Sequence, residues 1–164
     1  DHASETMFLG KFKVPLDDRN RVVLPAPFLS VLPTDPLEVS FVLYPARRGR
    51  VLRLYPLKPG EGLAEVLEHE NLGSKAEDGS VAFEEAMVHF MGSLCQVQMD
   101  KKHRVQIPEP AKAIAGIQRK AVLLGLSKLI EIWSPEVWER MMRAPETRTC
   151  KATAEASMPE PPAT

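Results

Sequence analysis

The chain has 164 residues, of which 44% are hydrophobic and 26% are charged, and its formal net charge is −1. These values are typical of one ordinary globular domain, or of two small ones that share a core, and the two cysteines argue against a disulfide scaffold. No apolar run has the length of a membrane-spanning helix and no basic-then-apolar leader is present, so we expect a cytoplasmic protein with no membrane partner.

The charges are distributed unevenly along the chain. Residues 11–53 hold eight Lys and Arg against four Asp and Glu, and residues 95–130 hold seven against two. Residues 61–85, in contrast, hold eight acidic residues and one lysine. This pattern predicts a basic and an acidic face, although charges that merely follow solvent exposure would give the same counts.

Two short stretches repeat one pattern. LDDRNRVVLP at residues 16–25 and MDKKHRVQIP at residues 99–108 both carry Asp-x-x-x-Arg, then Val and later Pro, and Asp17 and Asp100 are 83 positions apart (100 − 17). Alternating apolar residues on both sides predict half-buried strands around a hairpin-like turn, in which the Asp accepts hydrogen bonds from backbone N–H groups. The chain is therefore predicted to contain two copies of one strand–turn–strand unit.

The remaining elements follow in a similar order after each repeat. Apolar periodicity, prolines and glycines predict helices over 25–32, 63–70, 81–91 and 109–115, the third of them ending at Gly92, and strands over 38–43, 51–55, 121–124 and 129–133. Ser134 is predicted to cap a final helix that has Trp138, Met141 and Met142 on one side. We expect a polar loop over 71–80.

These elements predict four segments. Residues 7–57 form a first unit, residues 58–93 an acidic helical connector, and residues 94–143 a second unit with the final helix. Residues 144–164 are predicted to be a disordered tail, because their composition offers little apolar surface to offset the entropy of ordering them.

The sequence offers little support for catalysis or metal binding. The histidines lie far apart, with no His or Cys at ligand spacing, and they are His2, His69, His89 and His103. No nucleophile elbow and no glycine-rich phosphate loop is present. We therefore predict no catalytic residue, no metal and no cofactor, and we expect that the protein is not an enzyme.

Basic residues surround both predicted turns, and guanidinium groups on rigid turns suit phosphates and guanine edges. The predicted DNA-binding residues are Asp17, Arg19, Arg21, Asp100, Lys101, Lys102 and Arg104. The two Asp residues would orient Arg side chains rather than touch DNA. A purely structural role, with Asp capping the turn and Arg pairing with it, would suffice for a single copy, and both roles can hold at once. The presence of two copies favours a DNA-binding surface.

The chain resembles the MraZ family of bacterial transcription regulators over residues 7–142. Three stretches carry the resemblance, and they read MFLGKFKVPLDDRNRVVLPAPF, MDKKHRVQIPEPAKAIAGI and IEIWSPEVWERMM. The resemblance implies a mainly β fold with helices (α+β), in which two pseudo-twofold-related swapped-hairpin units of AbrB type form a double-layered, barrel-like sheet with peripheral helices. It also implies binding of double-stranded DNA through Asp-x-x-x-Arg, ring-shaped homo-oligomers associated with the nucleoid, and control of division and cell-wall genes.

The sequence departs from the family pattern before each Arg, where glycine is usual and Asn20 and His103 stand instead. Asn20 suits a left-handed turn, whereas His103 would cost on the order of 1 kcal/mol there. The main alternative function is a non-DNA homo-oligomeric assembly module of the swapped-hairpin type, in which the turns serve only subunit contact. The apolar stripes of 81–91 and 138–142 are predicted to form part of the subunit interface, unless both pack within the chain.

Overall fold

The computed structural model describes residues 7–58, 62–70, 72 and 81–143. Its strands are β1 (Phe8–Pro15), β2 (Arg21–Val23), β3 (Ser40–Ala46), β4 (Val51–Leu57), β5 (Cys95–Gln98), β6 (Arg104–Gln106), β7 (Lys120–Ser127) and β8 (Ile130–Trp133). Its helices are α1 (Ala26–Leu29), the 3-10 helix η2 (Pro36–Glu38), α2 (Ala64–His69), α3 (Val81–Ser93), α4 (Glu109–Ala115) and a helix over residues 135–143, here called the C-terminal helix. The fold is thus α+β, as predicted. The tail at 144–164 and all of the predicted loop at 71–80 except Leu72 lie outside the described residues.

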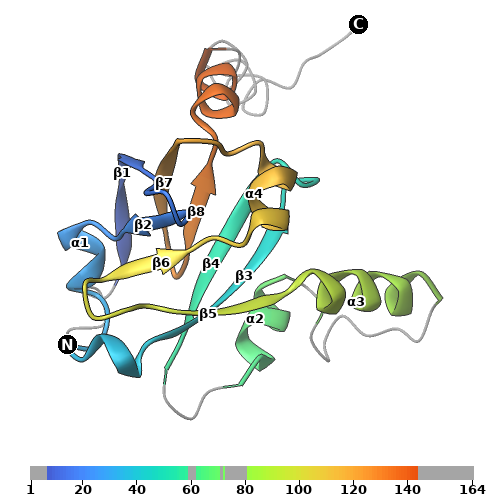
Figure 1. Ribbon diagram of the computed structural model, residues 1–164. Helices are drawn as coiled ribbons and strands as arrows, with labels where there is room; N and C mark the ends of the chain where they lie inside the picture. The colour runs from blue at the N-terminus through green and yellow to red at the C-terminus, as the bar shows by residue number, and fades with distance from the viewer. Residues whose placement is uncertain (1–6, 59–61, 71, 73–80, 144–164) are drawn as a thin grey trace, which may run out of the picture.

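The larger sheet has six antiparallel strands in the order β1-β7-β8-β4-β3-β5 (Figure 1). This order is symmetric, because β1 and β5 precede the two repeated turns, and the β3–β4 and β7–β8 hairpins follow them. The strand before each turn pairs with the hairpin that follows the other turn, so β1 pairs with β7 and β5 pairs with β3. The two halves of the chain are therefore interlocked within one sheet.

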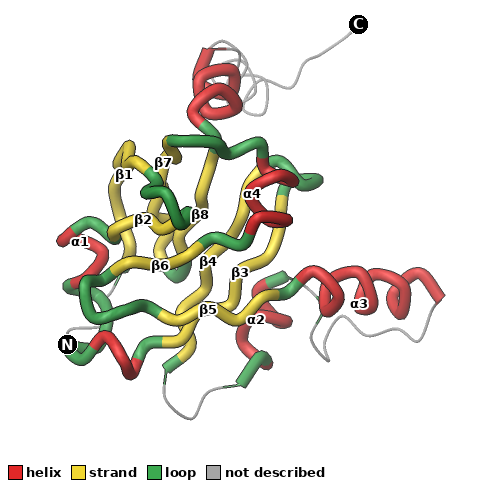
Figure 2. The backbone as a smooth tube through the Cα atoms, in the orientation of Figure 1, coloured by secondary structure: helices red, strands yellow, loops and turns green. Residues whose placement is uncertain are grey.

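A second, two-stranded sheet, here called the ribbon, lies in front of the larger one in Figures 1 and 2 and consists of β2 and β6. The strands are antiparallel, with Val22 opposite Val105, and both valines are fully buried. Backbone hydrogen bonds extend the pairing at both ends, from Leu24 N to His103 O (3.0 Å) and from Ile107 N to Asn20 O (2.8 Å). The predicted strand–turn–strand unit needs correction here, because the strand after each turn pairs with its counterpart in the other repeat and not with the strand before the turn.

The space between the ribbon and the large sheet holds the main hydrophobic core. Phe8, Phe28, Met99 and Ile107 are among its fully buried side chains, and Phe28 makes edge-to-face contacts with both Phe8 and Phe12 (ring centroids 5.6 and 5.2 Å apart). Alternate residues of β1 face this core, as the period-two pattern predicted. The core therefore fixes which face of the ribbon points outward.

Two helices differ in how they attach to this body. The C-terminal helix is capped as predicted, since Val137 N donates to the Ser134 hydroxyl (3.0 Å), and its Trp138 packs edge-to-face on Trp133 (5.2 Å). α3 continues through Gly92 to Ser93, two residues beyond the predicted last residue Met91, and none of its side chains is buried. In the described part of the chain, no helix is both long and apolar enough to cross a membrane.

Candidate nucleic-acid interface

The first repeated turn is organised around the carboxylate of Asp17. Its Oδ1 accepts hydrogen bonds from the backbone N–H groups of Arg19 and Arg21, both at 2.9 Å. Its Oδ2 accepts one from Nε of Arg21 at 2.8 Å, which is also an ion pair. The carboxylate therefore caps the turn and holds the Arg21 side chain in one orientation.

The second turn reproduces this geometry around Asp100. Oδ1 accepts from the N–H groups of Lys102 and Arg104, both at 2.9 Å, and Oδ2 accepts from Nε of Arg104 at 2.8 Å. The capping and orienting roles predicted for both Asp residues are therefore present in the structure. We call residues 17–21 the first corner and residues 100–104 the second corner.

Each corner requires a left-handed residue just before its arginine. Asn20 has φ = 63° and His103 has φ = 64°. Both residues therefore have the left-handed conformation that the sequence predicted. Asparagine tolerates this conformation, and a histidine is expected to carry a steric cost in it. The same backbone is thus formed at both corners despite the absence of the glycine that the resemblance implies.

Both corner carboxylates are held in the ionised state. The pKa of Asp17 lies below its usual value, mainly because the backbone N–H of Arg21 donates to it. At Asp100, desolvation is the largest effect and opposes ionisation, but the combined hydrogen bonds from Arg104 and Lys102 outweigh it and lower the pKa. Each carboxylate therefore remains a charged anchor for its arginine at neutral pH.

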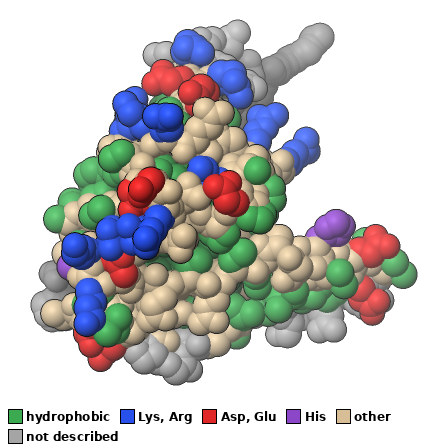
Figure 3. Space-filling model, in the orientation of Figure 1, with side chains coloured by type: hydrophobic (Ala, Val, Ile, Leu, Met, Phe, Trp, Pro, Cys, Tyr) green, Lys and Arg blue, Asp and Glu red, His purple; other side chains and the backbone are tan. Residues whose placement is uncertain are grey.

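The arginines lie on the outer face of the ribbon. Because Val22 and Val105 point into the core, their neighbours on each strand point away from it. Arg21 and Arg104 lie diagonally across the ribbon, with Val23 and Gln106 exposed beside them. Figure 3 shows Lys and Arg side chains gathered on the face of the molecule that carries the ribbon.

Most donor groups of the two arginines are uncommitted. In each, Nε bonds to the Asp, and no acceptor for the terminal Nη groups occurs among the described residues. Arg19, Lys101 and Lys102 are exposed on the turns themselves. This arrangement can present fixed, forked hydrogen-bond donors and positive charge to an anionic ligand.

The two corners differ in the side chains that hydrogen-bond to them from the other repeat, and the sequence pattern did not predict this difference. Asn20 donates to Glu109 (2.8 Å) and accepts from Lys112 Nζ (2.8 Å), while Gln106 Nε2 donates to the backbone O of Arg19 (3.0 Å). By the 83-residue repeat, the counterparts of Glu109, Lys112 and Gln106 at the second corner are Ala26, Leu29 and Val23. These side chains cannot form such bonds, so only the first corner has this polar brace.

The corners also differ in charge. Positions 17–21 carry two acidic and two basic residues, whereas positions 100–104 carry one acidic and three basic residues. The difference arises because Asp18 stands where the second corner has Lys101. The second corner is therefore the more attractive one to an anion.

Comparison with known proteins gives consistent matches. A family model described as "MraZ protein, putative antitoxin-like" matches residues 90–157. A relative from Clostridium beijerinckii is 33% identical over 132 residues, which cover 80% of this chain and 84% of the relative. Relatives from Thermomicrobium roseum (30% identical, 80% of this chain and 84% of the relative) and Clavibacter michiganensis subsp. michiganensis (30%, 93% and 98%) also match.

Each of these three relatives is named "Transcriptional regulator MraZ", a name that describes a non-enzymatic protein. The alignments span most of both chains, and the one with the Clavibacter michiganensis relative covers so much of this chain (93%) that it includes both repeats. The chain belongs to the MraZ family.

Proposed function

We propose that this protein is a DNA-binding transcription regulator that contacts duplex DNA with the outer face of the ribbon and with both corners. The observation that carries the proposal is the duplicated hydrogen-bond geometry, which holds Arg21 and Arg104 outward on one ribbon. The names of the relatives support the same function. The site has the seven residues predicted from the sequence, of which the five basic ones contact DNA while Asp17 and Asp100 position the arginines.

The dimensions of DNA suit this surface. The major groove of B-DNA is about 12 Å wide and admits a two-stranded β-ribbon. Residues placed diagonally on such a ribbon are about 7–8 Å apart, so Arg21 and Arg104 can reach different base pairs or phosphates. Gln106 and Val23 lie beside them on the exposed face, where an amide can bond adenine and an apolar group can contact a thymine methyl.

The interlocked strand pairing supports an interpretation as two swapped-hairpin units of AbrB type. In this proposal, residues 7–57 and 94–143 are the units and residues 58–93 connect them. Exchange of β1 and β5 between the halves, and the pairing of β2 with β6, are what such a swap requires. The large sheet and the ribbon would then be the two layers of a barrel-like core.

DNA recognition by one chain would be weak, because each good base contact contributes about 1–3 kcal/mol. A homo-oligomer, such as a ring, would align several pairs of corners with repeated operator boxes, and avidity would raise affinity about 10²–10⁴-fold. We therefore propose that the protein works as a homo-oligomer in the cytoplasm, associated with the nucleoid.

The alternative is an assembly module whose corners only contact other subunits, and it is favoured by the exposed apolar residues of α3. Binding of a random-sequence duplex at 50 and 200 mM salt distinguishes the two functions. A DNA-binding regulator will bind at low salt and lose at least about tenfold in affinity at high salt, since phosphate contacts release counterions. An assembly module will bind at neither concentration.

A further inference from the structure

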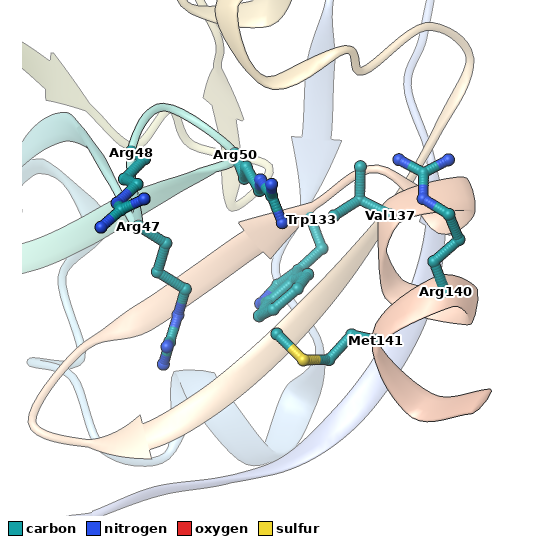
Figure 4. Close-up of a pocket in the computed structure, with 7 residues that line it drawn as sticks. All are labelled: Arg47, Arg48, Arg50, Trp133, Val137, Arg140 and Met141. Atoms are coloured by element: carbon teal, nitrogen blue, oxygen red, sulfur yellow. The ribbon is translucent and has the colours of Figure 1, made fainter. Parts of the chain in front are cut away.

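A cavity of about 560 Å³ lies between the turn that joins β3 to β4 and the C-terminal helix (Figure 4). Four arginines border it, three from the turn and one from the helix, and its apolar lining is Trp133, Val137 and Met141. Figure 4 shows the arginines of the turn on one side of the Trp133 ring, with Val137 and Arg140 of the helix on the other. We call this cavity the arginine pocket. Its volume is in the range of about 300–1,000 Å³ that is usual for small-molecule sites.

The pocket lies on the face of the large sheet that points away from the ribbon. Leu52 and Ile132 face the core beneath the ribbon, and successive residues of a strand point to opposite faces of a sheet. Val51 and Trp133, which pair across β4 and β8, therefore point to the other face, where they pack together. The pocket is thus separate from the two corners and from the proposed DNA surface.

The turn holds two arginines in a backbone conformation that disfavours them. Arg47 has φ = 53° and Arg48 has φ = 60°, and Gly49 follows with φ = 80°. Residues other than Gly, Asn and Asp rarely adopt this left-handed conformation, and backbone strain of this kind is concentrated at functional sites. The conformation suits Asn or Gly better than arginine, so the fold of the turn does not by itself explain the two arginines.

Arg47 is the arginine of the pocket that the fold uses. It forms an ion pair with the fully buried Glu131 (2.9 Å), and its guanidinium lies over the Trp133 ring, 5.7 Å from the ring centroid. Arg53 forms a second ion pair with Glu131 (3.0 Å). This buried carboxylate is therefore matched by two guanidinium groups and does not neutralise the other arginines of the pocket.

The other three arginines of the pocket, Arg48, Arg50 and Arg140, are exposed. Within the described part of the chain, no carboxylate lies at ion-pair distance from any of them. Glu136 and Glu139 belong to the same helix as Arg140, but neither lines the pocket. The pocket therefore combines three guanidinium groups that are not neutralised with an apolar lining.

We propose that the arginine pocket binds the diphosphate group of a small soluble molecule. Guanidinium groups remain charged at neutral pH and bind phosphate oxygens through paired N–H donors. A diphosphate group presents oxygens on two linked phosphorus atoms, so one ligand can accept hydrogen bonds from Arg48 and Arg50 on the turn and from Arg140 on the helix. Val137 and Met141 offer apolar contact to an organic body attached to the diphosphate. This site does not depend on the DNA-binding function proposed above.

Calorimetric titration of the full chain with adenosine compounds tests the chemistry of the ligand. ADP will bind, AMP will bind at least about tenfold more weakly because it lacks one charged phosphate, and adenosine will give no measurable binding. Inorganic pyrophosphate will also bind, and its affinity relative to that of ADP shows whether the pocket takes free pyrophosphate or an organic diphosphate. Absence of binding by both ADP and pyrophosphate at millimolar concentration, or ADP binding no tighter than AMP or adenosine, would overturn the inference.

Two pocket variants test the location of the site. Arg48→Gln with Arg50→Gln, and Arg140→Gln alone, remove charge at exposed positions and will each weaken ADP binding about tenfold or more. The matched control, Arg119→Gln with Lys128→Gln, removes two charges that do not line the pocket and will keep the parental affinity for ADP. A pocket variant with parental affinity, or a control that weakens binding as much as the pocket variants do, overturns the inference.

The corners are the other place where a diphosphate could bind, so Arg21→Gln with Arg104→Gln is titrated with ADP in parallel. Because the pocket lies on the far side of the large sheet from the ribbon, this variant will bind ADP as the parent does. Loss of ADP binding in this variant, with binding retained in the pocket variants, would overturn the inference and assign the diphosphate to the corners.

Discussion

Val22 and Val105 pair directly across the ribbon, and each is the counterpart of the other, since they are separated by the same 83 positions as Asp17 and Asp100 (105 − 22). A local twofold axis therefore passes between the two valines. This relationship places the two corners at opposite ends of one ribbon and turns both arginines to the same outer face.

Asn20 and His103 both have a left-handed backbone conformation, but we predict different effects on stability when each is replaced by glycine. His103→Gly removes steric cost at φ = 64° and will raise the free energy of unfolding by up to about 1 kcal/mol, or about 2–4 °C in melting temperature. Asn20→Gly relieves less strain and removes the bonds to Glu109 and Lys112, so it will not stabilise the protein. Thermal unfolding of both variants measures this, and equal stabilisation would show that the brace at the first corner is unimportant.

The corner carboxylates predict a specific sensitivity to acid. Because the pKa values of Asp17 and Asp100 are lowered by folding, the folded state binds fewer protons than the unfolded chain in acid. The two carboxylates stabilise the folded state fully at pH values above the pKa of an Asp in the unfolded chain, about 3.9. This stabilisation is lost as the pH falls from there through the lower pKa values of Asp17 and Asp100 in the folded state.

The double variant Asp17→Asn with Asp100→Asn will therefore melt at a lower temperature than the parent at pH 7, and the difference will shrink between pH 5 and pH 3. The pKa of Glu70 is also lowered, because the opposing effect of desolvation is outweighed by hydrogen bonds from Tyr44 and Arg53. Since Glu70 is present in both the parent and the variant, it does not contribute to the difference in melting temperature between them. A difference in melting temperature that stays constant over this pH range would contradict the role of ionisation at the corners.

Glu131 is the fully buried centre of a polar network. Arg47 and Arg53 both form ion pairs with it, at 2.9 and 3.0 Å, and the Trp133 indole donates to it at 3.0 Å. Removing one partner of a buried ion pair typically costs about 3–5 kcal/mol. Glu131→Gln will cause a loss of this size in urea unfolding, whereas Glu136→Gln, at an exposed position, will change stability by less than about 0.5 kcal/mol. A loss below about 1 kcal/mol at Glu131 would mean that the network is dispensable.

Much of this arrangement was predictable from the sequence, because it depends on local chemistry. The alternation around LDDRNRVVLP and MDKKHRVQIP predicted the strands, and Asp and Arg four positions apart predicted the capped turns. The exchange of strands between the repeats depends on long-range pairing, which a period-two pattern does not encode. The brace on Asn20 was missed for the same reason, since Glu109 and Lys112 are about ninety positions away in the chain.

The unequal charge of the corners predicts how DNA affinity can be raised. Asp18→Lys gives the first corner the residue that the second corner has at Lys101, and it removes a negative charge from the proposed DNA surface. We expect tighter duplex binding, with a salt slope steeper by up to about 0.9 if one phosphate contact is gained. Glu68→Lys on α2 makes the same change in net charge away from the ribbon, and an equal gain there would indicate a general charge effect.

The most direct test of the account is the salt dependence of duplex binding by the double variant Arg21→Ala with Arg104→Ala. Both ion pairs are partly exposed, so each loss will cost under about 1 kcal/mol of stability and the variant will stay folded. The account predicts much weaker binding and a salt slope reduced by about 0.9 for each phosphate contact removed, while Arg119→Ala with Lys128→Ala stays close to the parent. A folded double variant with parental affinity and parental slope would contradict the assignment of the corners to DNA.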